Sequence, residues 1–116
     1  MKENKLLTLA QEFAIEIIDI ANIVKGKGEK SFADQIKRSG TSISANIAEG
    51  NYPQSRADMI SKFEIALKEA SETENWLVVL NNSALIESVA FENARKKLIK
   101  IKILLINSIK TLKSKL

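Results

Sequence analysis

The sequence contains no cysteine and no histidine, and it has one proline and four glycines in 116 residues. Without cysteine and histidine it has no disulfide, no thiol nucleophile, no imidazole base and none of the usual zinc ligands. The di-iron motif of four-helix bundles is also excluded, because it requires a glutamate and a histidine three residues apart. Carboxylates are therefore the remaining candidates for metal or acid–base chemistry, and we expect no cofactor.

Long apolar runs are missing as well. The apolar run near the N-terminus is broken by Gln11 and Glu12, too early for a secretory signal, and the run at residues 103–106 is far too short to cross a membrane. We therefore expect a cytoplasmic protein with no membrane association. A chain of 116 residues has the length of one ordinary domain.

Apolar residues recur at three- and four-residue steps along four segments, which is the spacing of amphipathic helices. The segments cover approximately residues 4–25, 31–49, 55–81 and 85–115. With short connections and no strand pattern, the sequence predicts an all-α protein, a single antiparallel up-down four-helix bundle.

Residues at the ends of these segments are typical of helix boundaries. Gly26 follows the first segment, Ser31 is the expected N-cap of the second, and Gly50 stands where a C-cap would end it. Ser55 and Asp58 have the spacing of a capping box at the start of the third segment.

Five polar residues of the second and third segments form a candidate cluster: Arg38, Asn46, Glu49, Glu72 and Glu74. Glu74 falls in an apolar row, where a carboxylate needs a partner. If the two helices are adjacent, Arg38 can face a carboxylate of the third helix and Asn46 can hydrogen-bond between helices. We favour a buried network that fixes the helix register.

Two other interpretations of this cluster remain open. One is a metal or acid–base site built from Glu49, Glu72 and Glu74, because hard cations can be held by carboxylates alone. The other is a contact with a ligand or a protein partner.

Positive charge is concentrated in the last segment. Residues 91–116 contain eight basic residues and one acidic residue, a net of +7, whereas residues 1–90 contain ten basic and thirteen acidic residues. Such a helix is either a solvated face or a binding surface for nucleic-acid phosphates. The candidate contacts to RNA or DNA are Arg95, Lys96, Lys97, Lys100 and Lys102. Any binding should be salt-sensitive and independent of base sequence.

The last segment also carries a second apolar row, Ile99, Ile103 and Ile106, on the side nearly opposite its core row. A monomeric bundle has no use for this row, so we interpret it as an intersubunit surface. In the alternative interpretation this row, or Trp76, contacts a different protein.

Two stretches resemble a known family. They are QIKRSGTSISANIAEG at residues 35–50 and ALKEASETENWL at residues 66–77. They are similar to the bacterial four-helix bundle family whose members are encoded in intervening sequences of the 23S ribosomal RNA gene. The family pattern is a basic pair, here Lys37 and Arg38, then Ala-Asn-Ile-Ala-Glu-Gly, and later Glu-x-Glu, here Glu72 and Glu74.

The resemblance implies a compact bundle that assembles as a homopentamer and has no established enzymatic activity. A related branch contains the accessory protein of diversity-generating reverse transcriptases, where a basic pentamer is thought to engage nucleic acid and the polymerase. We therefore predict a non-enzymatic oligomeric scaffold that binds RNA or DNA through its last helix. The alternatives are an adaptor for another protein and, with least support, a carboxylate-based hydrolase or metal protein.

Overall fold

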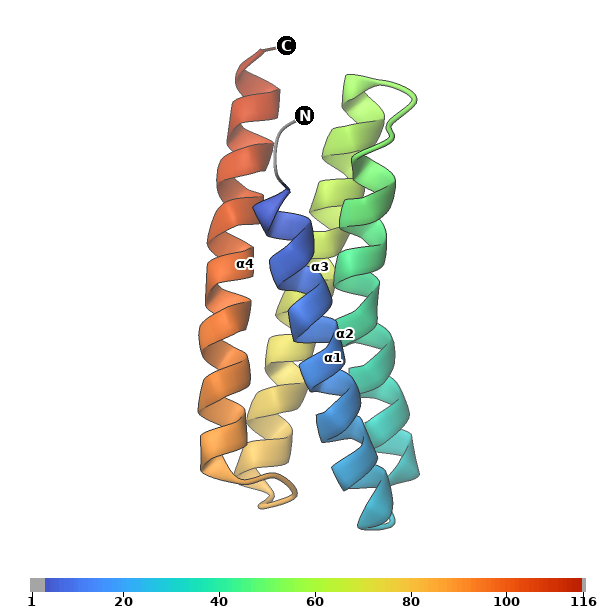
Figure 1. Ribbon diagram of the computed structural model, residues 1–116, viewed down its shortest axis with the longest axis vertical. Helices are drawn as coiled ribbons and strands as arrows, with labels where there is room; N and C mark the ends of the chain where they lie inside the picture. Colours follow the sequence, from blue (N-terminus) through green and yellow to red (C-terminus); the bar gives the residue numbers. More distant parts are fainter. Residues whose placement is uncertain (1–3, 116) are drawn as a thin grey trace.

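The computed structural model describes residues 4–115, and this range contains four α-helices and no strand (Figure 1). The helices are α1 (Lys5–Gly26), α2 (Lys30–Gly50), α3 (Arg56–Asn82) and α4 (Ser88–Ser114). The all-α, four-helix prediction is confirmed. The largest difference between a predicted and an observed helix limit is three residues, at the start of α4.

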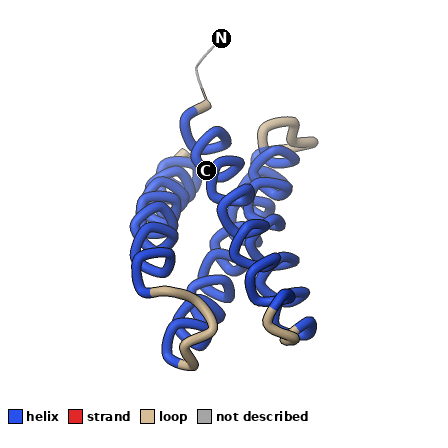
Figure 2. The backbone as a smooth tube through the Cα atoms, turned by 60° about the horizontal axis from the view of Figure 1, so that its bottom comes forward, coloured by secondary structure: helices blue, strands red, loops and turns tan. Residues whose placement is uncertain are grey.

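The four helices lie side by side in an elongated bundle of 47 × 23 × 21 Å. Each helix packs against the helices next to it in the chain, and α1 also packs against α4. The connections between helices lie at the two ends of the bundle (Figure 2). Within residues 4–115, no helix combines the length and the apolar character that crossing a membrane requires.

One apolar core runs along the bundle axis and receives side chains from all four helices. Its largest fully buried members include Phe13 and Ile17 of α1, Ile43 of α2, Leu77 of α3 and Leu98 of α4. These residues stand at the three- and four-residue steps of the apolar pattern, so each helix turns its apolar side inward.

Two glycines in α2 allow neighbouring helices to approach closely. A Cβ atom on Gly40 would lie 2.6 Å from Ile17 Cγ2, and one on Gly50 would lie 2.6 Å from Phe63 Cε1. Gly50 is therefore a packing residue inside the last turn of α2, and the predicted C-cap role is wrong. The C-cap is Asn51, which keeps a right-handed helical conformation.

The start of α3 follows the sequence prediction. The Ser55 hydroxyl accepts a hydrogen bond from the Asp58 N–H over 3.0 Å, and Asp58 Oδ2 accepts one from the Gln54 N–H over 3.1 Å. The first bond satisfies a backbone donor that the first turn of a helix leaves free, and the second ties Gln54, the residue before the N-cap, to that turn.

The start of α2 differs from the prediction, because the N-cap is Glu29 and not Ser31. Glu29 forms no side-chain capping bond there. In the first turn Lys30 Nζ donates a hydrogen bond to Asp34 Oδ2 over 2.9 Å, and this bond lowers the pKa of the Asp34 carboxyl. Gly28, with φ of +88°, supplies the turn from α1, so the chain enters α2 earlier than a serine cap would require.

Candidate functional site

The predicted polar cluster has one strong contact between α2 and α3. Arg38 Nη2 donates a hydrogen bond to Glu72 Oε2 over 2.7 Å, and Arg38 Nη1 lies 3.9 Å from Glu69 Oε1. The prediction that Arg38 faces a carboxylate of the third helix is confirmed. The Arg38 side chain is 55% exposed and that of Glu72 is 35% exposed, so the pair lies in the groove between the helices and not in a sealed interior.

Asn46 and Glu49 do not join this pair. Asn46 Nδ2 donates to the backbone oxygen of Ser42 over 2.8 Å, within its own helix, and the predicted bond between helices is not present in this structure. Glu49 is 63% exposed at its side chain and lies 3.8 Å from Lys62 Nζ. The amide of Asn46 therefore satisfies a carbonyl of α2, and Glu49 belongs to a separate surface contact.

Glu74 lies on the other side of α3, toward α4. Its Oε1 atom accepts a hydrogen bond from Lys102 Nζ over 2.9 Å, and its Oε2 atom lies 3.7 Å from Arg95 Nε. The carboxylate has the partners that the sequence analysis required, but it occupies the edge of the helix and not the core row. Thr73 occupies the core row, and its side chain is fully buried.

The buried polar contact between α2 and α3 involves two residues that the sequence analysis did not select. The Thr73 hydroxyl donates to Ser39 Oγ over 2.9 Å, and neither residue is exposed. Thr73 Oγ1 also lies 2.7 Å from the backbone oxygen of Glu69. The sequence could have indicated Thr73 from its position, three residues after Ala70 and four before Leu77. This position fits the apolar core row of the helix as well as the position of Glu74 does.

The three acids of the proposed metal site are held apart by different partners. Glu72 pairs with Arg38 and Glu49 with Lys62, both across the α2–α3 groove, whereas Glu74 pairs with α4. Arg38 and Glu49 are separated by about 16 Å along α2, at 1.5 Å per residue. Within residues 4–115, no group of three acidic side chains has the arrangement of a metal site.

The basic residues of α4 divide into two groups. The first group forms ion pairs within the chain: Arg95 and Lys102 with Glu74, Lys97 with Glu16 at 3.0 Å, and Lys113 with Glu64 at 2.9 Å. The second group is exposed and forms no ion pair with the described part of the chain: Lys96, Lys100 and Lys110. Of the five predicted nucleic-acid contacts, Lys96 and Lys100 thus keep their charge unpaired.

The second apolar row of α4 is exposed to solvent. Ile99 is 38%, Ile103 is 53% and Ile106 is 42% exposed. They share the outward face of α4 with Lys96, Lys100 and Lys110, because residues three, four and seven apart lie on one side of a helix. Apolar surface and unpaired positive charge therefore occupy the same face.

The Trp76 side chain is partly buried against the bundle. It packs against the core, and its ring centroid lies 5.8 Å from that of Phe32. The indole Nε1 atom is buried and has no hydrogen-bond partner among the described residues. This side chain is therefore less available to another protein than the Ile99, Ile103 and Ile106 row.

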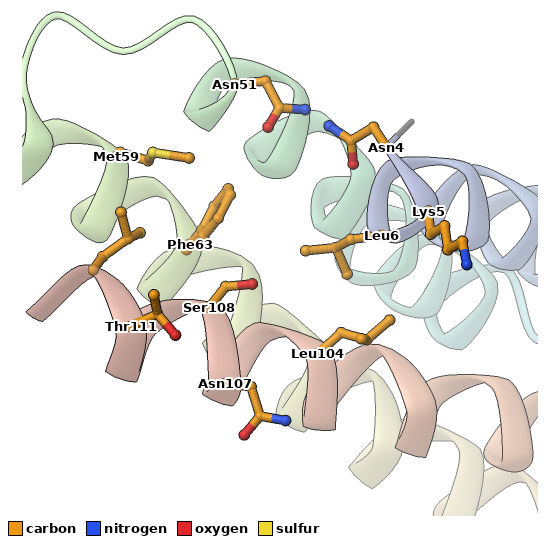
Figure 3. Close-up of a pocket in the computed structure, with 11 residues that line it drawn as sticks. Asn4, Lys5, Leu6, Asn51, Met59, Phe63, Leu104, Asn107, Ser108 and Thr111 are labelled. Atoms are coloured by element: carbon orange, nitrogen blue, oxygen red, sulfur yellow. The ribbon is translucent and has the colours of Figure 1, made fainter. Parts of the chain in front are cut away.

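An open cavity of about 510 Å³ lies at the start of α1, beside the C-terminal half of α4 (Figure 3). Leu6 from α1, Phe63 from α3 and Leu104 from α4 point into it, and its rim carries amide and hydroxyl side chains such as Asn51 and Ser108 (Figure 3). Lys5 is the one ionisable residue among those that line it. This lining contains no acid, so it lacks the paired groups that general acid–base chemistry would need.

Comparisons with known proteins identify the family. Residues 2–107 match the family model described as 23S rRNA-intervening sequence protein. The chain is also similar to a crystal structure of a protein with unknown function from the S23 ribosomal protein family of Bacteroides thetaiotaomicron VPI-5482. The identity is 42%, the match covers 90% of this chain and 98% of that one, and the TM-score is 0.87. A search of curated proteins finds no match. Since the family model covers nearly the whole sequence, the chain belongs to the 23S rRNA-intervening sequence protein family.

Proposed function

We propose that this protein is a non-enzymatic cytoplasmic scaffold that associates with copies of itself, as a homopentamer, and binds nucleic-acid phosphates through α4. The observation that carries the proposal is the outward face of α4. On that face the unpaired Lys96, Lys100 and Lys110 stand beside exposed isoleucines.

Self-association is supported by the exposed isoleucines. Ile99, Ile103 and Ile106 form a continuous row on a helix whose opposite side already fills the core. Apolar rows of this kind, rimmed by polar residues, are typical of protein interfaces. The number five comes from the resemblance to the family and is part of the proposal.

The ion pairs of the three glutamates in the predicted cluster support a non-enzymatic role. Glu49, Glu72 and Glu74 each pair with a different cation, at three separate places. Acid–base hydrolysis uses carboxylates that meet at one substrate, and these three do not meet. This arrangement favours fixing the helix register over hydrolysis.

Phosphate binding is supported by Lys96, Lys100 and Lys110, which form no ion pair with the described residues. Lysine side chains contact phosphates as point charges and read no base sequence. Single-strand binding would also need aromatic side chains for stacking, but the exposed aromatic residue of the described chain is Tyr52, in the turn between α2 and α3. We therefore propose that these lysines contact the phosphate backbone of duplex DNA or structured RNA.

The test is a fluorescence-anisotropy titration of an RNA hairpin and a DNA duplex at about 50 and 200 mM salt. We expect binding that weakens steeply with salt and is lost in the variant K96E/K100E. The matched control is K37E/K68E, which makes the same change in charge at exposed lysines of α2 and α3. Absence of binding by the unaltered protein at the lower salt would contradict the nucleic-acid part of the proposal. Equal losses in the two variants would show that total charge matters and α4 does not.

A second candidate function is that of an adaptor for a different protein. It is favoured by the same exposed row of Ile99, Ile103 and Ile106, which could contact a partner of another sequence. The two candidates differ in what the isolated protein does. A chain that stays monomeric at high concentration and binds no nucleic acid would support the adaptor.

A further inference from the structure

A strip of three residues on the outward side of α1 combines two acidic side chains with an exposed isoleucine. It consists of Glu12, Ile15 and Asp19, spaced so that they lie along one side of the helix. Ile15 is 64% exposed. Glu12 and Asp19 are exposed and form no ion pair with the described residues. We call this set the α1 strip.

A strip on the outward side of α4 has the opposite charge. It consists of Lys96, Ile99, Lys100 and Ile103, and its two lysines have no ion-pair partner in the described chain. We call this set the α4 strip. The two strips match in character, since each places an exposed isoleucine between charged residues and the charges are of opposite sign.

The two strips lie at the same level along the bundle. The level is fixed by the ion pair between Glu16 of α1 and Lys97 of α4, whose Oε1 and Nζ atoms are 3.0 Å apart. The helices run in opposite directions, because Ile23 lines a groove together with Ala90, while Leu6 lines a cavity with Ser108. Counting along both helices from the ion pair therefore gives the relative height of any two residues.

At a rise of 1.5 Å per residue, the charged residues fall at matching heights. Asp19 and Lys96 differ by about 3 Å, and Glu12 and Lys100 by about 1.5 Å, along the bundle axis. Ile15 and Ile99 also differ by about 1.5 Å. A lysine side chain can span such offsets, so each acid has a base at its own level.

Within one copy these residues do not pair. Asp19 and Lys96 both line the groove between α1 and α4, but no ion pair within 4.0 Å joins the α1 strip to the α4 strip. The base that α1 does engage on α4 is Lys97, through Glu16. The outward residues of the two strips therefore remain available to another molecule.

We propose that the α1 strip of one copy docks on the α4 strip of the next copy. This inference rests on the self-association proposed above and names its two surfaces. Rotation about an axis parallel to the bundle keeps every residue at its height. A neighbouring α4 strip therefore meets the α1 strip with Asp19 opposite Lys96, Ile15 opposite Ile99, and Glu12 opposite Lys100. Two different surfaces make a head-to-tail contact, which produces a ring when the rotation closes.

This contact is compatible with phosphate binding. Each ammonium group has three donors, so Lys96 and Lys100 can pair with a neighbour's carboxylates and still donate to a phosphate. Lys110 lies outside the α4 strip and keeps its charge unpaired.

The test measures mass by sedimentation velocity for four proteins: the unaltered chain, E12K/D19K, K96E/K100E and the combined fourfold variant. We expect the unaltered chain to be oligomeric and each double variant to dissociate, with a dissociation constant raised roughly tenfold or more by like-charge repulsion. The fourfold variant should recover the assembly, because opposite charges face each other again at every contact. The control E49K/E87K makes the same change in charge as E12K/D19K, at exposed acids of other parts of the surface, and should leave the mass unchanged.

The outcomes separate this inference from the proposed function. A monomeric unaltered chain would overturn the proposed self-association itself. An oligomer that withstands both double variants would keep self-association and overturn the assignment of the two strips. Dissociation that the fourfold variant does not reverse would also overturn the assignment, and circular dichroism of each variant shows whether its helices are intact.

Discussion

The hydroxyl groups of Ser39 and Thr73 lie 2.9 Å apart in the fully buried contact between α2 and α3. This is a polar bond inside an otherwise apolar layer, and its two partners belong to different helices. A buried hydroxyl that loses its partner costs free energy, whereas removing both partners together can be almost neutral. We therefore expect the pair to contribute to the specific alignment of the two helices.

Thr73→Val should lower the free energy of unfolding by about 1–2 kcal/mol, because it leaves the Ser39 hydroxyl with only the backbone oxygen of Ile36, 3.3 Å away. The double variant S39A/T73V should lose less than the sum of the two single changes. Urea denaturation of the four proteins gives this coupling. Thr41→Val is the control, since Thr41 bonds within its own helix, and it should change stability by less than about 0.5 kcal/mol. Strict additivity of the two single changes would contradict the prediction.

Gly40→Ala should destabilise the bundle although alanine is the better helix former. The new Cβ would lie 2.6 Å from Ile17 Cγ2, and Ile17 is fully buried. Overpacking of this kind costs roughly 1–3 kcal/mol, against a gain of about 1 kcal/mol in helix propensity. We expect a net loss of up to about 2 kcal/mol in the free energy of unfolding.

The control for this change is Gly26→Ala at the end of α1, where a Cβ would meet nothing within 4 Å. It should be neutral or stabilising by a few tenths of a kcal/mol. If the two alanine variants have the same stability, the close approach of α1 and α2 does not depend on Gly40.

The helices and their inward faces could be predicted from the sequence because local spacing determines them. The Ser55 N-cap appears as predicted, since its bond joins residues three positions apart, whereas the Asp58 carboxylate accepts from the N–H of Gln54 and not from that of Ser55. The contact of Arg38 with Glu72 could also be anticipated, because a long side chain reaches across a groove without a precise helix orientation.

The finer contacts depend on the rotation of each helix about its axis, which spacing does not determine. Thr73 and Glu74 fit the core row of α3 equally well in sequence, and a small rotation buries the first and places the second beside Lys102. Similarly, eight basic residues near the C-terminus do not reveal that Lys97 is paired and Lys96 is not. That difference depends on Glu16, which lies far away in the sequence.

Glu74→Gln should lower the free energy of unfolding by about 1 kcal/mol, because it removes the charge that holds Lys102 at 2.9 Å and Arg95 at 3.7 Å. The carboxylate is 27% exposed, so solvent screens it only in part. The loss should be smaller in high salt, where the pair in the unaltered protein is itself weakened. Thermal or urea unfolding at two salt concentrations measures both effects.

Glu64→Gln is the matched control, because Glu64 pairs with Lys113 at the same 2.9 Å but is 49% exposed. Exposed pairs contribute little, so this change should be close to neutral. A larger effect at Glu64 than at Glu74 would contradict the link between burial and stabilisation. Unchanged stability in Glu74→Gln would mean that the contact between α3 and α4 depends on apolar packing alone.

Trp76→Phe should leave the stability within about 0.5 kcal/mol of the unaltered protein or raise it slightly. The indole Nε1 atom is buried without an acceptor among residues 4–115, and such a donor costs free energy that phenylalanine does not incur. The smaller ring can still pack against Phe32, whose centroid lies 5.8 Å away. Trp76→Ala removes this packing as well and should cost roughly 2–4 kcal/mol. Urea denaturation of both variants separates the two contributions. A loss above about 1 kcal/mol in Trp76→Phe would contradict this prediction.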